Sequence, residues 1–367
     1  MKTKSKLIKP ATKQSLITYV ILIVAFVAVQ VILSTVGMPR MIKGLLVPLC
    51  VYGMLAVSLN LTVGILGELS LGQAGFMCVG AYAGTLFSTL TVDVIPNSFI
   101  RFPIALVLGG VIAAIFGVLV GVPVLRLRGD YLAIVTLAFG EIIKNIFGSI
   151  YLGRDAEGFH ISFKSASDMN LAADGETIID GALGMSGIPK DSNFTVAFVL
   201  LFITVIIAYN FINSRTGRAV MSIRDNRIAA ESIGLNITKY KLITFGLTAF
   251  LAGVAGVLYS HNFSSLQATA ANTYDYNRSI LILVFVVLGG IGSIRGSVIA
   301  AVVLTLIPEL LRDSIGEYRM LFYAVILIAM MLITSNSKIK SRLSAYFDKI
   351  KALVVKEKKG EVNNGNA

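Results

Sequence analysis

SRTGRAVMSIRDNRIAAESIGLNITKYK, the segment from Ser214 to Lys241, is the longest polar and charge-dense stretch that lies between two strongly apolar stretches of this chain. The sequence on either side is apolar enough to lie in lipid. Because charged side chains are costly to place in lipid, this segment is expected to stay in water. The pattern therefore predicts a water-exposed segment that is held against a membrane at both ends.

The middle of this segment has the pattern of a short amphipathic helix. Ser222 can cap its start by accepting a hydrogen bond from a first-turn amide, and Gly234 can end it in the left-handed conformation. The apolar residues near one face are Val220, Ile223, Ala230 and Ile233. From the pattern alone, two hypotheses stay open: a helix that transmits force to another protein, and a solvated loop that only connects two membrane spans.

The composition indicates a polytopic membrane protein. Of the 367 residues 56% are hydrophobic and 14% are charged, whereas soluble domains carry about 25% charged residues. The net charge of +12 resides in loops and termini without interleaved aromatic residues, which argues against nucleic-acid binding. The two cysteines lie outside any CxxC motif and the two histidines are isolated, so no disulfide, metal site or catalytic cluster is predicted.

Ten apolar runs are long enough, or nearly long enough, to cross a bilayer, which needs about 20 residues in a helix. The predicted fold is therefore an all-α polytopic membrane protein with about ten transmembrane helices. The first run is interpreted as an uncleaved span rather than a signal peptide. The runs are Leu16–Val36, Met41–Leu61, Ser70–Leu90, Pro103–Leu125, Tyr131–Ile150, Phe194–Ile212, Leu242–Ser260, Ser279–Gly292, Ser297–Leu311 and Leu321–Thr334.

The distribution of basic residues predicts the orientation. With ten spans and both termini inside, more than two thirds of the 32 Lys and Arg residues fall in inside segments, as the positive-inside rule requires. The short run 279–292 is alternatively a broken or re-entrant helix, which needs protein or a cavity to cover its backbone. The predicted organisation is a basic cytoplasmic N-terminus (1–13), a transmembrane region (14–337) and a basic cytoplasmic tail (338–367).

Two loops stand out in this organisation. The inside loop is residues 213–241, which contains the opening segment. The outside loop, residues 153–192, is long and acidic. Loops of this length usually have a role or are disordered, and two interpretations stay open: a docking surface for an external partner, and a solvated flap.

Four polar residues are candidates for lining a transport pathway. The glycine-punctuated run Gly64–Gly75 contains Glu68, Ser70 and Gln73, and such glycines loosen a helix and expose its carbonyl groups. A tight turn at the membrane surface is the alternative for this run. Glu141 lies inside the fifth apolar run three residues before Lys144, and an ionisable residue within a span is a functional candidate because its burial is costly. A structural pair with Lys144 is the alternative for Glu141.

Several blocks of this sequence resemble the permease subunits of branched-chain amino acid (LIV-type) ABC importers, specifically the longer M-type subunit. Together they cover about residues 45–303. Urea and amide importers have similar permeases, so the resemblance is more specific for the family than for the substrate. The blocks are Leu59–Phe76, Leu125–Glu141, Ser214–Gly234, Ala252–Gly256 and Leu288–Gly296.

The resemblance implies a type II ABC importer-like permease in the bacterial inner membrane, with cytoplasmic termini. It implies a second permease subunit, two cytoplasmic ATPases and an extracytoplasmic binding protein. No GxxxxGK[ST] phosphate loop is present in this sequence. ATP would therefore be used by the ATPases, and no cofactor is expected on this chain, which is not expected to be an enzyme.

The resemblance also turns the opening segment into a predicted coupling helix whose apolar face enters a groove on the ATPase. The E-A-A-x3-G pattern of ABC permeases is matched by Ala229, Ala230 and Gly234, whereas Ile228 occupies the glutamate position and the distal I-x-L-P element is absent. The residues predicted to couple to the ATPase are Gly217, Arg218, Ile223, Arg224, Ala229, Ala230 and Gly234.

The function implied by the resemblance is uptake of Leu, Ile and Val. A urea or short-amide importer is the alternative within the family. A secondary transporter or channel usually places several ionisable groups at mid-membrane, and this chain offers few. A membrane enzyme would need a cluster of His, Asp or Glu at membrane depth, which the sequence lacks.

Overall fold

The computed structural model describes residues 10–35, 40–125, 129–155, 158–169, 171, 175–268 and 273–310, with five further positions between 321 and 328. Residues Met1–Thr305 form one compact unit and Leu306–Ala367 a second. The α-helices are α1 (Pro10–Thr35), α2 (Arg40–Asn60), α3 (Gln73–Leu90), α4 (Ser98–Val124), α5 (Asp130–Ser149), α6 (Phe194–Asn213), α7 (Arg215–Asp225), α8 (Arg227–Ser232), α9 (Ile237–Ser260), α10 (Tyr276–Gly289) and α11 (Ile294–Leu310).

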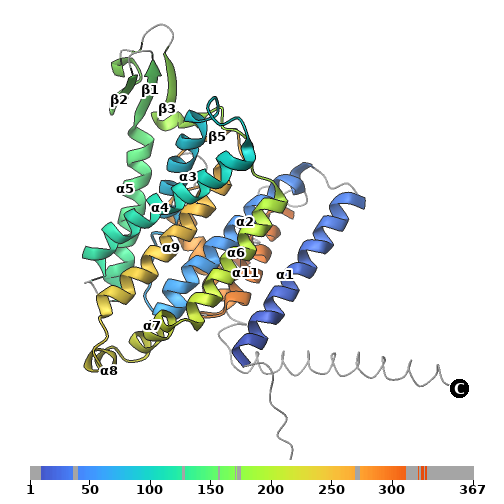
Figure 1. Cartoon of the computed structure of the whole chain (residues 1–367), viewed down its shortest axis with the longest axis vertical. Helices are drawn as coiled ribbons and strands as arrows, with labels where there is room; N and C mark the ends of the chain where they lie inside the picture. Colours follow the sequence, from blue (N-terminus) through green and yellow to red (C-terminus); the bar gives the residue numbers. More distant parts are fainter. Residues whose placement is uncertain are drawn as a thin grey trace, which may run out of the picture. The chain divides into compact units, whose positions relative to one another are not determined.

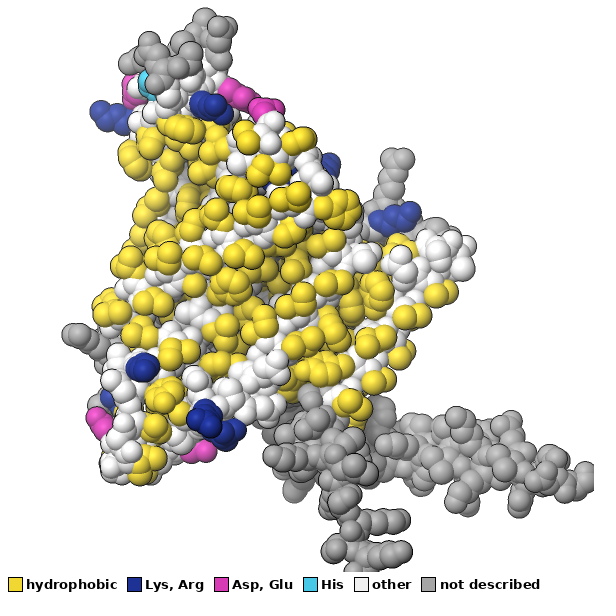
Figure 2. All heavy atoms as spheres, in the orientation of Figure 1, with side chains coloured by type: hydrophobic (Ala, Val, Ile, Leu, Met, Phe, Trp, Pro, Cys, Tyr) yellow, Lys and Arg dark blue, Asp and Glu magenta, His cyan; other side chains and the backbone are white. Residues whose placement is uncertain are grey.

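The predicted helical membrane architecture is confirmed, but the count of ten spans is not. Among the residues that the structure describes, six helical segments are long and apolar enough to cross a membrane, and α10 is a shorter apolar helix. The predicted tenth run, 321–334, lies almost entirely outside the described residues. The hydrophobic side chains cover the middle of the face in Figure 2, and charged side chains gather toward its two ends, as a membrane-spanning bundle requires.

Several helix starts differ from those of the predicted runs; α9, for example, begins at Ile237, five residues before the predicted Leu242. Helix α4 begins at Ser98, five residues before the predicted Pro103, because Asn97 accepts a hydrogen bond from the Phe99 amide and caps the helix. Helix α3 begins at Gln73 rather than Ser70, because the chain before it is not helical. A six-residue π-helix, η1 (Leu61–Leu66), continues α2, and Gly67 ends it in the left-handed conformation with φ +78°.

Helices α3, α4 and α9 form the most closely packed part of the bundle. Glycine makes this approach possible: a side chain at Gly80 of α3 would collide with the backbone of Gly253 in α9, and one at Gly109 of α4 would lie 2.7 Å from the Gly80 carbonyl oxygen. Small residues at helix interfaces allow this contact in membranes, where apolar side chains gain little from burial. The small residues of these helices are therefore part of the core.

The long loop predicted as a docking surface or a solvated flap contains regular structure. Strand β1 (Tyr151–Asp155) pairs in antiparallel fashion with β2 (Gly158–Ser162) and β3 (Glu176–Asp180), in the order β2-β1-β3. The other elements here are the 3-10 turns η2 (Ser167–Met169) and η3 (Gly181–Leu183) and the short pair of β4 (Met185–Ser186) with β5 (Ser265–Leu266). The three-stranded sheet follows α5 at one end of the bundle, and α7 and α8 lie at the opposite end (Figure 1). We call these the sheet end and the α7 end.

Candidate functional site

The opening segment forms two short helices rather than one. Ser214 caps α7 by accepting a hydrogen bond from the Gly217 amide at 3.0 Å, and Asn226 caps α8 by accepting one from the Ala229 amide at 3.0 Å. The prediction that Ser222 starts the helix is wrong, because its hydroxyl donates within α7 to the Ala219 carbonyl. The prediction that Gly234 ends the helix is confirmed, since its φ is +85° directly after α8.

Gly217 and Arg218 fix the corner between α6 and α7. A side chain at Gly217 would collide with the carbonyl oxygens of Phe211 and Ile212, so only glycine lets α7 turn this closely onto the end of α6. The Arg218 guanidinium donates to the Asn213 carbonyl at 2.8 Å. These two predicted coupling residues therefore hold α7 to a membrane helix.

The apolar face of the segment packs into its own chain. Ile223 and Ala230 form a buried cluster with Ile237 of α9, and Val220 is fully buried. This corrects the expectation that the face of Ile223 and Ala230 enters a groove on a partner, since their contacts lie within this chain. The large apolar side chains left exposed are instead Ile228, at 81%, and Ile233, at 74%. Ile233 thus does not share the buried face, as predicted, and Ala229 is also exposed.

Arg224 links α7 directly to η1. Its guanidinium donates to the Gly64 carbonyl at 2.8 Å and also pairs with Asp225 at 2.9 Å. In a π-helix the regular carbonyl bonding is disturbed, and such distortions occur frequently at functional sites. A side chain at Gly67 would lie 2.5 Å from Cγ of Arg224, so the arginine chain also packs on this glycine.

The chain after η1 is a non-helical segment, residues 67–72, that leads to α3. Glu68 forms an ion pair with Lys241, which is buried at the start of α9. The Leu71 amide donates to the Thr136 hydroxyl of α5 at 2.9 Å. Ser70 is buried and its hydroxyl has no hydrogen-bond partner in the described structure. The segment is thus held by side chains of α5 and α9 instead of by helical hydrogen bonds.

Gln73 and Glu141 lie in one region, where α3, α5 and α10 meet. Gln73 donates to the Ser58 hydroxyl of α2 at 2.6 Å, and the Ala74 amide donates to the Ser279 hydroxyl of α10 at 3.1 Å. Gly75 approaches Gly140, the neighbour of Glu141, so closely that a side chain on Gly75 would lie 2.7 Å from the Gly140 Cα. The structure therefore groups these two pathway candidates, while Glu68 lies apart against Lys241. Whether any of the four candidates lines a pathway stays a prediction.

Glu141 belongs to a cluster of three charges. Its carboxylate lies 2.8 Å from the Lys144 ammonium and accepts a hydrogen bond at 2.8 Å from the Tyr276 amide, the first of α10. Lys144 also lies 2.9 Å from Asp275, which caps α10. The predicted structural pair of Glu141 and Lys144 thus exists, with a second carboxylate that carries the cluster to a net negative charge.

Sequence reasoning missed Asp275 and Lys241. Asp275 precedes an apolar run directly, which is the position of an N-cap, and this signal was available. Lys241 had no such signal, because its partner Glu68 is 173 positions away. Among the residues that the structure describes, no group of three or more His, Cys, Asp or Glu side chains could hold a metal ion.

Comparison with known families matches residues 41–334 to the family described as the permease component of branched-chain amino acid transport systems. The high-affinity branched-chain amino acid transport system permease protein LivM of Salmonella typhimurium is 33% identical over 294 residues, which cover 77% of this chain and 66% of that protein. LivM of Escherichia coli is 32% identical over 294 residues, with the same coverage. This chain thus spans just under two thirds of the length of these relatives.

Sugar permeases are also similar, at lower identity. The ribose import permease protein RbsC of Escherichia coli is 24% identical over 296 residues, which cover 78% of this chain and 83% of that protein. No solved structure matches the chain.

Proposed function

The chain belongs to the family of permease components of branched-chain amino acid transport systems, and from this premise we propose that it is the transmembrane permease subunit of an ATP-driven importer. Its substrates are Leu, Ile and Val, delivered by an extracytoplasmic binding protein. The ATP is hydrolysed by two cytoplasmic ATPase chains. A second permease subunit completes the pathway, and the assembly lies in the bacterial inner membrane with the α7 end and both termini in the cytoplasm.

The observation that carries the coupling role is the linkage at the α7 end. Ile228 and Ile233 are exposed in and just after α8, in the segment where Val220, Ile223 and Ala230 are buried. An exposed apolar pair on a helix suits insertion into a groove of a partner. Arg224 joins the same element to the backbone of η1. Movement of the ATPase would therefore displace η1 and the 67–72 segment that follows it.

The substrate is supported by the relatives. Identity to the two LivM proteins is 32–33%, against 24% to the ribose permease RbsC. A permease for urea, a short amide or a sugar is the alternative. The few charged residues among the described helices suit a zwitterion with an aliphatic side chain.

The test of function is uptake in proteoliposomes that contain this chain, its co-encoded partner subunits and the binding protein. We expect ATP-dependent uptake of labelled leucine that excess isoleucine or valine blocks and that urea or ribose does not. Uptake that needs no ATP would instead support a secondary transporter. Competition by urea or ribose alone would reassign the substrate.

A pair of variants tests the coupling role. Ile228→Asp should reduce uptake about a hundredfold while the protein stays folded, because Ile228 is 81% exposed and its loss affects only the partner contact. Ile223→Asp buries a charge inside the chain and should lower the yield of folded protein. Normal uptake by folded Ile228→Asp protein would rule out α8 as the docking element.

A further inference from the structure

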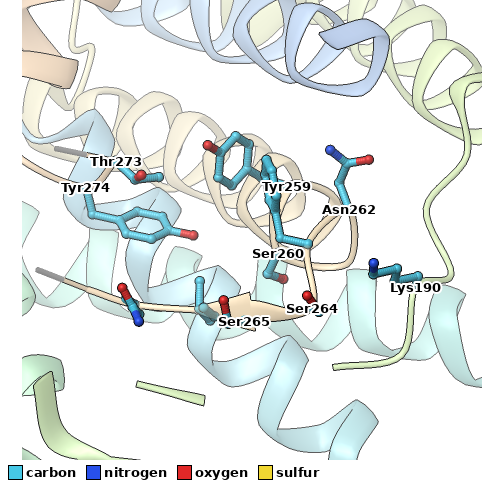
Figure 3. Close-up of a pocket in the computed structure, with 11 residues that line it drawn as sticks. Lys190, Tyr259, Ser260, Asn262, Ser264, Ser265, Thr273 and Tyr274 are labelled. Atoms are coloured by element: carbon cyan, nitrogen blue, oxygen red, sulfur yellow. The ribbon is translucent and has the colours of Figure 1, made fainter. Parts of the chain in front are cut away.

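A polar cavity of about 320 Å³ lies at the sheet end, between the end of α9, the β5 strand and the start of α10. This volume is at the lower end of the range for small-molecule sites. Figure 3 shows the side chains that surround it. Besides Ser260 and two tyrosines, the polar residues that line it are Lys190, Asn262, Ser264, Ser265, Gln267 and Thr273.

Tyr274 gives this cavity an unsatisfied hydrogen-bond donor. Its side chain is 1% exposed, and its hydroxyl has no hydrogen-bond partner in the described structure. The hydroxyl points into the cavity, toward the space beside Ser260 and Ser265 (Figure 3). Buried hydroxyls are normally paired, and an unpaired one is costly. An occupant of the cavity that accepts a hydrogen bond would remove this cost.

The charge around the cavity is positive. Lys190 is the one charged side chain among the described residues that line it, and no ion pair of Lys190 is found in the described structure. Arg278 does not line the cavity: its guanidinium is 5.0 Å from the ring centre of Tyr52, which packs beside Tyr259 of the cavity wall. The lining cation Lys190 and the unpaired Tyr274 hydroxyl favour an anionic group over a cationic one.

We propose that this cavity binds the carboxylate group of a free amino acid. The Tyr274 hydroxyl donates a hydrogen bond to the carboxylate, and Lys190 supplies the opposite charge. Oxygen atoms of Asn262 or Gln267 accept from the α-ammonium group. The preference for a carboxylate rests on the geometry alone, whereas the choice of leucine as the probe rests on the proposed function.

The test measures binding of labelled leucine to the full chain in lipid nanodiscs, without ATPases or binding protein. We expect leucine and 4-methylpentanoate, which keeps the carboxylate, to bind, and leucinamide, which lacks it, to bind at least about tenfold more weakly. Tyr274→Phe should weaken leucine binding about tenfold. Lys190→Gln should weaken it by a similar factor, and its exposed position makes misfolding a small risk. Matched controls are Tyr131→Phe and Lys164→Gln, which change exposed residues outside the cavity.

Equal binding of leucine and leucinamide, an absence of leucine binding, or wild-type affinity in both cavity variants would overturn the inference. Uptake by the complete transporter is measured in parallel. ATP-dependent uptake without carboxylate-dependent binding would support the proposed importer function and reject the proposed cavity site. Carboxylate-dependent binding without ATP-dependent uptake would support the proposed cavity site and reject the proposed importer function.

Discussion

The two ends of the helical bundle use charged side chains differently. At the α7 end, Arg224 and Lys241 reach from the loop and the start of α9 to η1 and to Glu68, segments that are not regular α-helix. At the sheet end, Arg101 of α4 pairs with Asp191, which precedes α6, at 2.8 Å. The sheet strands bond mainly to one another. The charged contacts at the α7 end thus link α7 and α9 to non-α-helical segments of the bundle, whereas the ion pair at the sheet end joins the start of α4 to the segment before α6.

The sharpest test of this difference is Arg101→Ala. It leaves the Asp191 carboxylate buried without its partner, since the two side chains are only 4% and 9% exposed. Loss of one partner of a buried pair costs about 3–5 kcal/mol of unfolding free energy. Thermal unfolding in detergent can be followed with a thiol-reactive dye, because Cys50 and Cys78 are free and buried. Uptake per ATP hydrolysed by the remaining folded protein should stay normal, and a loss of coupling would show that the two ends do not differ.

Arg224→Ala tests the α7 end. It removes the hydrogen bond to the Gly64 carbonyl and should lower leucine uptake about tenfold, while ATP hydrolysis continues and the unfolding temperature changes little. Lys239→Ala is the control, since Lys239 is exposed at the start of α9 and lies outside α7 and α8. Parallel losses of uptake and ATP hydrolysis would mean that Arg224 holds the partner contact rather than transmitting movement.

Gly67→Ala should have a smaller effect. Its φ of +78° is unfavourable for alanine, and the added methyl group would press on Arg224. We expect a loss of about 1–2 kcal/mol in stability together with a partial loss of coupling. Gly44→Ala is the matched control, because nothing lies within 4 Å of the added methyl group. Equal behaviour of both variants in unfolding and uptake would argue against strain at Gly67.

The smallest effect is expected from pH at the sheet end. His261, at the end of α9, is buried, and desolvation lowers its pKa, with Arg101 acting in the same direction and the Val257 carbonyl and Asp191 opposing. The unfolded chain therefore binds this proton more readily. The stability contribution is complete above about pH 6.5, the pKa of an unperturbed histidine, and is lost as the pH falls below it toward the lowered pKa. Unfolding temperatures of wild type and His261→Gln between pH 7.5 and 5 should differ in slope, and identical slopes would exclude His261 as the cause.

Much of the fold could be predicted from sequence because lipid demands long apolar helices, and runs such as 194–212 follow from hydropathy alone. The short helices could not be placed as well, because caps compete locally: Ser214, Ser222 and Asn226 are all suitable residues, and packing of Gly217 against α6 selects Ser214. The candidate coupling segment was proposed through resemblance, and the roles of its residues stay predictions. The links of Arg224 and Lys241 depend on contacts across 160 and 173 positions, which no local pattern encodes.

The non-helical segment before α3, residues 67–72, also affects how the protein inserts into the membrane. A continuous helix satisfies its own backbone and can insert alone. Residues 67–72 cannot, because their polar groups need partners from later helices. The Leu71 amide donates to the Thr136 hydroxyl of α5, and the Glu68 carboxylate pairs with Lys241 of α9. During synthesis, α3 is made well before either partner exists. We expect this part of the chain to stay near the aqueous edge of the insertion machinery until α9 has emerged, which makes assembly of the coupling end a late step in biogenesis.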